Sequence, residues 1–256
     1  MLPQLEVIAR KAGDAIMEVF REAHGADGVE SQQKTDGSPV TEADRRAHAV
    51  ISKALAESWP DIPIFSEEGK NIPFVERSQW KRYWLVDPLD GTKEFIRGLD
   101  EFTVNIALIE GGRPVLGVVY APAKDVFYSG SLESGAVIVE PGQPPRAIKV
   151  LPPDPPEGLI VVVSRSHPSD ELEDYLRDLP VAERIPSGSS LKLCAIAEGR
   201  AHLYPRLGPT SEWDIAAGQA VVEAAGGEVV DLDGRPLAYN KENILNPDFV
   251  ARGRAG

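Results

Sequence analysis

The stretch of sequence that decides the fold is Tyr83-Trp84-Leu85-Val86-Asp87-Pro88-Leu89-Asp90-Gly91-Thr92. Its first four residues are apolar, which predicts a buried strand, and the strand leads directly into two aspartates three positions apart. Pro88 stiffens the connection, and Gly91 allows the backbone to come close to a ligand. A helix that began at Gly91-Thr92 would point its free N–H groups toward the same place as the two carboxylates.

This motif has two interpretations of about equal weight. In the first, Asp87 and Asp90 bind a hard cation, and the helix N-terminus binds phosphate. In the second, Asp-Pro and Asp-Gly make a turn followed by a helix cap. The spacing alone does not separate the two interpretations.

Acidic residues recur at three other places. Ser66-Glu67-Glu68-Gly69 follows the short apolar run 62–65, where adjacent acids are usually solvated. Thr41-Glu42-Ala43-Asp44 and the pair Ser211 with Asp214 fit helix N-caps, and for either acid alone capping is the favoured interpretation. Together, however, acids from four places supply the oxygen ligands that Mg²⁺ requires, and paired sites use carboxylates that bridge ions about 3.5–4 Å apart. The four scattered histidines and the single cysteine do not suggest zinc.

Composition narrows the class of protein. The 256 residues are enough for one large domain or two modest subdomains. A formal net charge of −13 argues against a nucleic-acid binder, although divalent cations can reverse the sign of an acidic site toward a small phosphorylated substrate. The single cysteine excludes an intrachain disulfide, no apolar run approaches a membrane span, and the acidic first segment does not fit a signal peptide. We therefore expect a cytoplasmic protein without an integral membrane segment.

Periodicity predicts two halves. Helices are expected at 2–23 and from Thr41 onward, and a β-hairpin is expected with strands at 102–109 and 114–120. The proline-rich stretch 141–157 is the candidate boundary. Residues 1–145 are then helices on a mainly antiparallel sheet with most of the metal ligands. Residues 146–256 form an α/β part, with a strand at 159–163 buried on both faces and helices near 168–178, 189–199 and 212–225.

Taken in order over nearly the whole chain, the four acidic motifs resemble the signature of the lithium-sensitive, Mg²⁺-dependent inositol monophosphatase superfamily. Within it, four segments resemble the 3′(2′),5′-bisphosphate nucleotidase branch and its bacterial CysQ-type members: Asp90-Gly91-Thr92-Lys93-Glu94-Phe95, Ser164-Arg165-Ser166-His167, Gly188-Ser189-Ser190-Leu191-Lys192 and Leu203-Tyr204-Pro205-Arg206. The resemblance implies the sugar-phosphatase fold, a layered αβαβα sandwich of mixed α+β and α/β character.

The same resemblance implies a metal site with two or three Mg²⁺ ions. One ion would be held by Glu67, Asp87 and the backbone carbonyl of Leu89. A second would be held by Asp87, Asp90 and Asp214. A third, weaker ion would lie near Glu67, with Asp36 as a helper.

The implied reaction is hydrolysis of 3′-phosphoadenosine 5′-phosphate to AMP and phosphate. Thr92, hydrogen-bonded to Asp44, would orient the attacking water and help to deprotonate it. The implied substrate contacts are Gly91, Thr92, Ser164, His167, Gly188 and Lys192. On general grounds, residues 164–167 could equally be a turn and a helix start, and Lys192 a solvated surface lysine.

Two alternatives remain open. One is another phosphatase of the superfamily that acts on inositol or sugar phosphates. The other is a metal-stabilised protein that binds phosphorylated nucleotides without turnover. The presence of both Thr92 and Asp44 argues against the second, because binding alone needs no water-activating pair. The sequence leaves oligomeric state and contact with the inner face of the cell membrane open.

Overall fold

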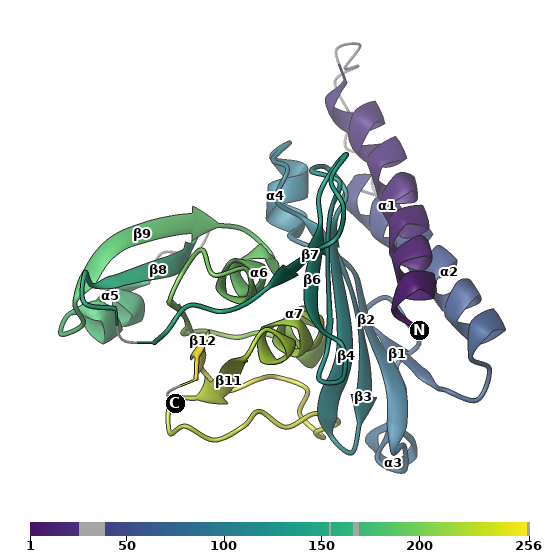
Figure 1. The fold of residues 1–256 in the computed structure, drawn as a ribbon. Coiled ribbons are helices and arrows are strands. Elements are labelled where there is room, and N and C mark those ends of the chain that lie inside the picture. The colour runs from purple at the N-terminus through teal and green to yellow at the C-terminus, as the bar shows by residue number, and fades with distance from the viewer. Residues whose placement is uncertain (26–38, 154, 166–168, 255–256) are drawn as a thin grey trace.

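The computed structural model describes residues 1–25, 39–153, 155–165 and 169–254. The described residues form layers in the order helix, sheet, helix, sheet, helix (Figure 1). The αβαβα sandwich implied by the resemblance is therefore confirmed.

Within these ranges, the chain as far as Ile148 builds a seven-stranded sheet in chain order. Its strands are β1 (Ile64–Ser66), β2 (Arg82–Asp90), β3 (Thr103–Glu110), β4 (Arg113–Ala121), β5 (Val126–Ser131), β6 (Gly135–Val139) and β7 (Arg146–Ile148). β1 is parallel to β2, and the other neighbours are antiparallel. The predicted hairpin is β3–β4, closed by Gly111 and Gly112 at positive φ.

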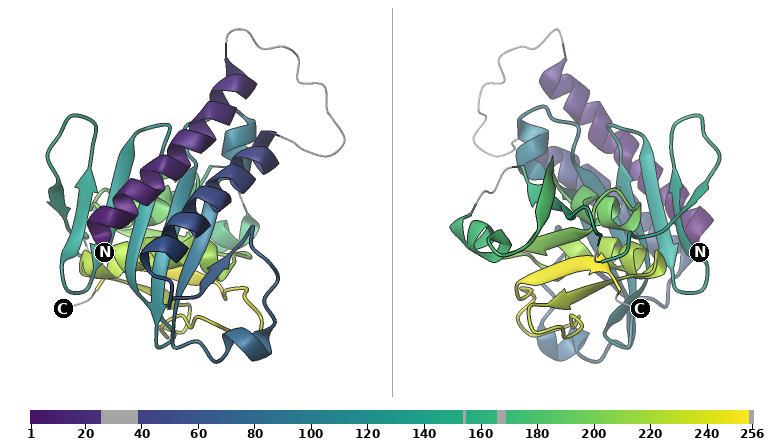
Figure 2. Two further views of the ribbon diagram at one scale, coloured as in Figure 1. Left: turned by 90° about the vertical axis from the view of Figure 1, so that its right-hand side faces the viewer. Right: turned by 60° about the vertical axis from the view of Figure 1, so that its left-hand side comes forward.

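Two long helices, α1 (Leu2–His24) and α2 (Pro39–Ser58), lie across one face of this sheet (Figure 2). Both were expected from their apolar periodicity, and the buried residues Leu5, Ala12 and Ile16 of α1 sit at the predicted spacing. The short helices α3 (Phe74–Arg77) and α4 (Thr92–Ile96) connect strands at the ends of the sheet. Apolar side chains of α1, α2 and α4 pack against the sheet in one of the core clusters found among the described residues.

The second half forms a five-stranded sheet within the described residues, in the order β11-β12-β10-β8-β9. The elements are β8 (Leu159–Ser164), α5 (Asp170–Leu176), β9 (Val181–Ser187), α6 (Leu191–Ala197), β10 (Leu203–Arg206), α7 (Glu212–Ala224), β11 (Gly227–Asp231) and β12 (Phe249–Gly253). As predicted, β8 is covered on both faces. Val161 packs in the cluster under α5, and Val162 packs in the central core.

The central layer, α6 and α7, is packed between the two sheets and joins both halves in a single core. Gly117 on β4 makes the close approach of α7 possible, because a Cβ at this position would lie 2.3 Å from the carbonyl oxygen of Ala217. β7 pairs with β6 in the first sheet, just past the expected boundary at 145/146. The division into halves stays a prediction.

Candidate active site

Strand register places the first two acids side by side. β1 runs parallel to β2 with Ser66 opposite Val86, and the Glu67 N–H donates to the Val86 carbonyl over 3.1 Å. Each strand therefore delivers its next residue, Glu67 or Asp87, to the same edge of the sheet.

The end of β2 turns sharply around the second aspartate. The register with β3 shifts between Asp87 and Asp90, and the Leu89 N–H donates to Asp87 Oδ1 over 3.1 Å. Gly91 has φ of +95°, and a Cβ there would lie 2.9 Å from the Glu101 carbonyl oxygen, so only glycine fits without strain. α4 then starts at Thr92 but is only five residues long, so its dipole is a weak anchor for phosphate.

Asp214 comes from the second half, in the first turn of α7. Its Oδ2 accepts a hydrogen bond of 2.8 Å from the Ser211 N–H, and the Ser211 side chain accepts one from the Asp214 backbone. The capping interpretation of this motif is thus correct. Because a carboxylate has two oxygens, Oδ1 is left for other partners.

Burial and the charges of neighbouring acids raise the pKa values of these carboxylates. The pKa of Asp87, which is 1% exposed, is raised well above its usual range by burial and then by the charges of Asp90, Glu67 and Asp214. Burial and the charge of Asp90 raise the pKa of Asp214 to about 7. Burial and the nearby charges of Glu68 and Glu67 raise the pKa of Asp44 to about 8. A concentration of negative charge this dense calls for positive counter-charge.

The donor set fits a hard divalent cation, because every candidate ligand is an oxygen. Asp44 Oδ1 is also buried without a hydrogen-bond partner in the described part of the chain. In the described ranges, no three His, Cys, Asp or Glu side chains already stand together as a ready-made metal site.

Sequence reasoning missed the groups that hold Asp90. Asp90 Oδ2 lies 2.6 Å from Ser189 Oγ and 3.0 Å from Ser190 Oγ, just before α6. Thr103 Oγ1 lies 2.6 Å from the Ser189 hydroxyl, and Asn105 Nδ2 donates to that of Ser190. The motif Gly188–Lys192 contains both serines, but only its first and last residues were singled out. The two serines are therefore visible in the motif, and their hydroxyl groups are the signal that could have indicated partners for a carboxylate.

The general expectation that Lys192 is a solvated surface lysine is wrong. Its side chain is not solvated: the residue is 8% exposed, and Nζ donates to the Ser189 carbonyl over 2.6 Å. Burial lowers the pKa of Lys192 to about 8, against the opposing effect of Asp90. A buried ammonium group beside the carboxylate cluster is typical of a functional site.

A cleft opens between the two halves at this cluster. Its lining includes Asp90, Gly91, Thr92, Ser164, Ser189, Ser190, Lys192, Tyr204, Arg206, Thr210 and Asp214. Arg206 is a further residue that sequence reasoning did not select. Its Nε is buried and has no partner among the described residues, while its NH2 group donates to the Pro209 carbonyl.

Other predicted contacts lie outside the cleft lining, lie outside the described residues or are not formed. Gly188 is not among the lining residues; its N–H donates to Glu101 Oε2 over 2.9 Å. Asp36 and His167 lie outside the described residues. The predicted hydrogen bond between Thr92 and Asp44 is not formed in the described structure, although α4 and α2 pack against each other.

The layered fold and this cluster of carboxylates point to one family of proteins. The model of the inositol monophosphatase family matches residues 2–254, and the chain belongs to that family. Among curated relatives, the 3′(2′),5′-bisphosphate nucleotidase CysQ of Salmonella typhimurium is 52% identical over 250 residues, covering 97% of this chain and 98% of the relative. The protein of the same name from Escherichia coli K12 is 51% identical over 251 residues, covering 97% of this chain and 98% of the relative.

Solved structures agree with this assignment. The crystal structure of CysQ from Bacteroides thetaiotaomicron has a TM-score of 0.86 at 39% identity, covering 97% of this chain and 95% of that one. The inositol monophosphatase from Anabaena has a TM-score of 0.73 at 25% identity, covering 98% and 89%. Among the helices described, none combines the length and the apolar character needed to cross a membrane.

Proposed function

We propose that this protein hydrolyses 3′-phosphoadenosine 5′-phosphate to AMP and inorganic phosphate in a Mg²⁺-dependent reaction. The relatives named 3′(2′),5′-bisphosphate nucleotidase, which match nearly the whole chain, support the substrate and the reaction. The observation that carries the proposal is the meeting of Asp90 and Asp214, from the two halves, in the lining of one cleft that also includes Lys192 and Arg206.

The metal ligands stay as the resemblance implied. Glu67, Asp87 and the Leu89 carbonyl would hold one ion, and Asp87, Asp90 and Asp214 a second; a third, near Glu67, would be helped by Asp36. Bound Mg²⁺ would neutralise the repulsion among these carboxylates and lower the pKa of adjacent water. Ser189 and Ser190 restrict the Asp90 carboxylate to one orientation through Oδ2, which leaves Oδ1 for the site.

Thr92 and Asp44 are the groups proposed to orient the attacking water. Asp44 Oδ1 is buried and has no partner within the described residues, so it can accept a hydrogen bond from the Thr92 hydroxyl after side-chain rotation. The threonine oxygen would in turn accept a hydrogen bond from the water. This arrangement aims a lone pair of the water at phosphorus while the proton is drawn toward the carboxylate.

The substrate would lie across the cleft. Its 3′-phosphate would occupy the edge formed by Asp90, Gly91 and Thr92, and its 5′-phosphate would face Lys192 and Arg206. Lys192 Nζ uses one donor on the Ser189 carbonyl and keeps others for phosphate. Ser164 and His167 are the remaining candidate contacts, whereas Gly188 would act only by shaping the loop that Glu101 holds.

A panel of substrates tests this function. Phosphate release should be measured with 3′-phosphoadenosine 5′-phosphate, AMP, inositol 1-phosphate and fructose 1,6-bisphosphate, with Mg²⁺ and with excess chelator. We expect the bisphosphate nucleotide to be preferred and chelator to abolish turnover. Preference for inositol or sugar phosphate would replace the nucleotidase assignment with another phosphatase of the family. Nucleotide binding with no phosphate release would indicate the binding protein.

A further inference from the structure

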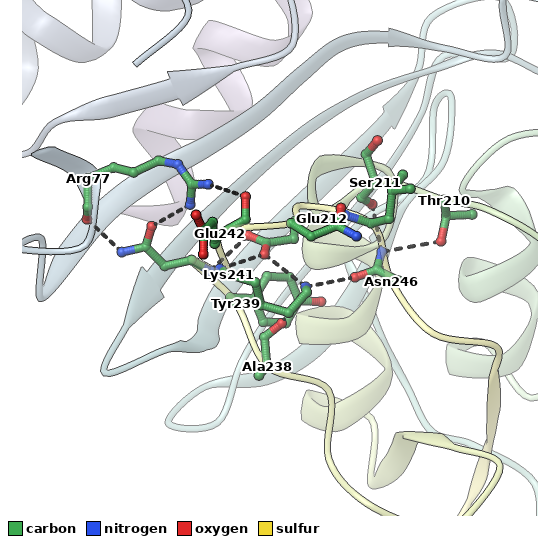
Figure 3. Close-up of polar contacts among 12 residues, drawn as sticks. Arg77, Thr210, Ser211, Glu212, Ala238, Tyr239, Lys241, Glu242 and Asn246 are labelled. Atoms are coloured by element: carbon green, nitrogen blue, oxygen red, sulfur yellow. Dashed lines mark hydrogen bonds and ion pairs between the residues drawn. The ribbon is translucent and has the colours of Figure 1, made fainter. Parts of the chain in front are cut away.

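The first residue of α7 carries a buried carboxylate that has no part in the reaction outlined above. Glu212 is 0% exposed. It accepts hydrogen bonds from the backbone N–H groups of Asn240 (2.8 Å) and Lys241 (2.9 Å) and from Lys241 Nζ (2.8 Å) (Figure 3). We call the loop 238–246, together with its partners Arg77 and Glu212, the C-terminal clamp.

The clamp reaches the backbone just ahead of Asp214. Lys241 Nζ also donates to Asn246 Oδ1 over 3.3 Å, and Asn246 Nδ2 donates to the Ser211 carbonyl over 2.7 Å (Figure 3). The Ser211 N–H is the group that donates to Asp214 Oδ2. These hydrogen bonds, joined through the backbone of Ser211, link the lysine ammonium to the orientation of the Asp214 carboxylate.

The other end of the clamp holds the first half of the chain. Arg77 is 4% exposed; it donates to Asn240 Oδ1 and to the Glu242 carbonyl, both over 3.0 Å, and its own carbonyl accepts from Asn240 Nδ2. The Arg77 guanidinium lies 5.2 Å from the centroid of the Phe65 ring, and Phe65 precedes the Ser66–Glu67 step of β1.

A contact between two aromatic rings also joins the two halves. Phe65 meets Trp213 edge-on, with centroids 5.7 Å apart. Phe65 lies two residues before Glu67, and Trp213 is the immediate neighbour of Asp214. Through its contacts at both ends, the clamp is thus connected to segments that carry ligands from opposite halves.

A role in stability alone does not require this chemistry. A buried ion pair is often no more stabilising than apolar residues of the same volume, whereas directional hydrogen bonds fix orientation. We propose that the C-terminal clamp, through Lys241, Glu212 and Asn246, is a positioning device that sets Asp214 relative to Glu67 for metal binding. This inference rests on the proposed function.

The test compares clamp variants with a control on β4 that removes a different ion pair to α7. Lys241→Met removes the ammonium group but keeps the stem, and Lys241→Arg restores the charge. Asn246→Ala keeps the ion pair but cuts the link to Ser211. The control is Arg113→Met, because Arg113 lies 3.8 Å from the buried carboxylate of Glu223 near the far end of α7. For each full-length protein, Mg²⁺ binding is measured by titration calorimetry, and Tm is measured without metal.

Lys241→Met should raise the Mg²⁺ dissociation constant severalfold. This is less than the roughly 10- to 100-fold typical when a direct partner of a metal ligand is lost, because Lys241 reaches Asp214 only through Asn246 and Ser211. Asn246→Ala should weaken binding in the same direction, and Lys241→Arg should recover most of the affinity. Arg113→Met should lower Tm while Mg²⁺ affinity stays at the wild-type value.

If Lys241→Met and Asn246→Ala lower Tm but bind Mg²⁺ like wild type, the clamp is structural only and the inference fails. Should Lys241→Met not fold, Asn246→Ala alone decides. A wild-type protein that neither binds Mg²⁺ nor releases phosphate would overturn the proposed function itself, and the inference with it.

Discussion

Replacing Lys192 by methionine tests substrate choice most directly. The change keeps the apolar stem of this buried side chain and removes the ammonium group, whose nitrogen lies 5.8 Å from the centroid of the Tyr204 ring. Two effects follow. The Ser189 carbonyl loses a donor at 2.6 Å, which disturbs the loop that holds Asp90. The 5′-phosphate of the nucleotide also loses its proposed cation.

The two effects can be separated because they differ between substrates. Disturbance of Asp90 lowers kcat/KM for every phosphate ester, since all of them are cleaved at the same carboxylate cluster. Loss of a charge-assisted hydrogen bond to phosphate, about 1.5–3 kcal/mol, lowers only the value for a substrate with a second phosphate. At 1.4 kcal/mol per factor of ten, that contact is worth roughly 10- to 150-fold in the ratio of the two kcat/KM values.

The assay measures kcat/KM for 3′-phosphoadenosine 5′-phosphate and inositol 1-phosphate at saturating Mg²⁺. For wild type we expect a ratio of at least about 100, because the inositol ester lacks both the base and the second phosphate. Lys192→Met should reduce the ratio by the factor above, while Ser189→Ala, which disturbs only Asp90, should lower both values together. An unchanged ratio in Lys192→Met would refute a direct contact with the 5′-phosphate.

Three further predictions concern the metals and the nucleophile. Asp87→Asn removes an ionisable group from a buried cluster of like charges, so the Tm of the metal-free protein should rise. Activity should largely disappear, and so should the gain in Tm on adding Mg²⁺. A wild-type gain in Tm on adding Mg²⁺ would contradict the proposal that Asp87 is shared by two ions. Thr92→Ala and Asp44→Asn should each lower kcat about 10²–10⁴-fold with little change in Mg²⁺ affinity by calorimetry, and losses below tenfold would reduce the pair to a capping role. Li⁺ should inhibit at concentrations where Na⁺ at equal ionic strength does not, and equal inhibition by both salts would count against the family's metal chemistry.

Local pattern predicted the elements that carry the acids. The apolar run before Asp87 is β2, the S-x-x-D pattern at Ser211 is a capping box, and the hairpin turn falls at Gly111-Gly112. These features depend on neighbours a few residues apart, so periodicity and turn chemistry suffice to find them.

Contacts over long sequence separations could not be predicted in this way. Ser189 and Ser190 reach Asp90 across 99 and 100 positions, and Lys192 is buried only because α6 packs between two sheets. Local composition predicts neither the burial of that lysine nor the lack of a partner for Arg206 Nε among the described residues. The family resemblance supplied Lys192, because it carries information about tertiary placement that residue patterns do not.

The structural and functional interpretations of the acidic motifs were treated as rivals, yet a carboxylate can satisfy both. Asp87 Oδ1 accepts the Leu89 N–H as a turn residue should, and Asp214 Oδ2 caps α7. Each keeps a second oxygen in the region where the charges converge. The local hydrogen bond fixes the plane of the carboxylate and so directs the remaining oxygen toward the site. Capping and the proposed ligation are therefore compatible at these positions, and evidence for the first does not count against the second.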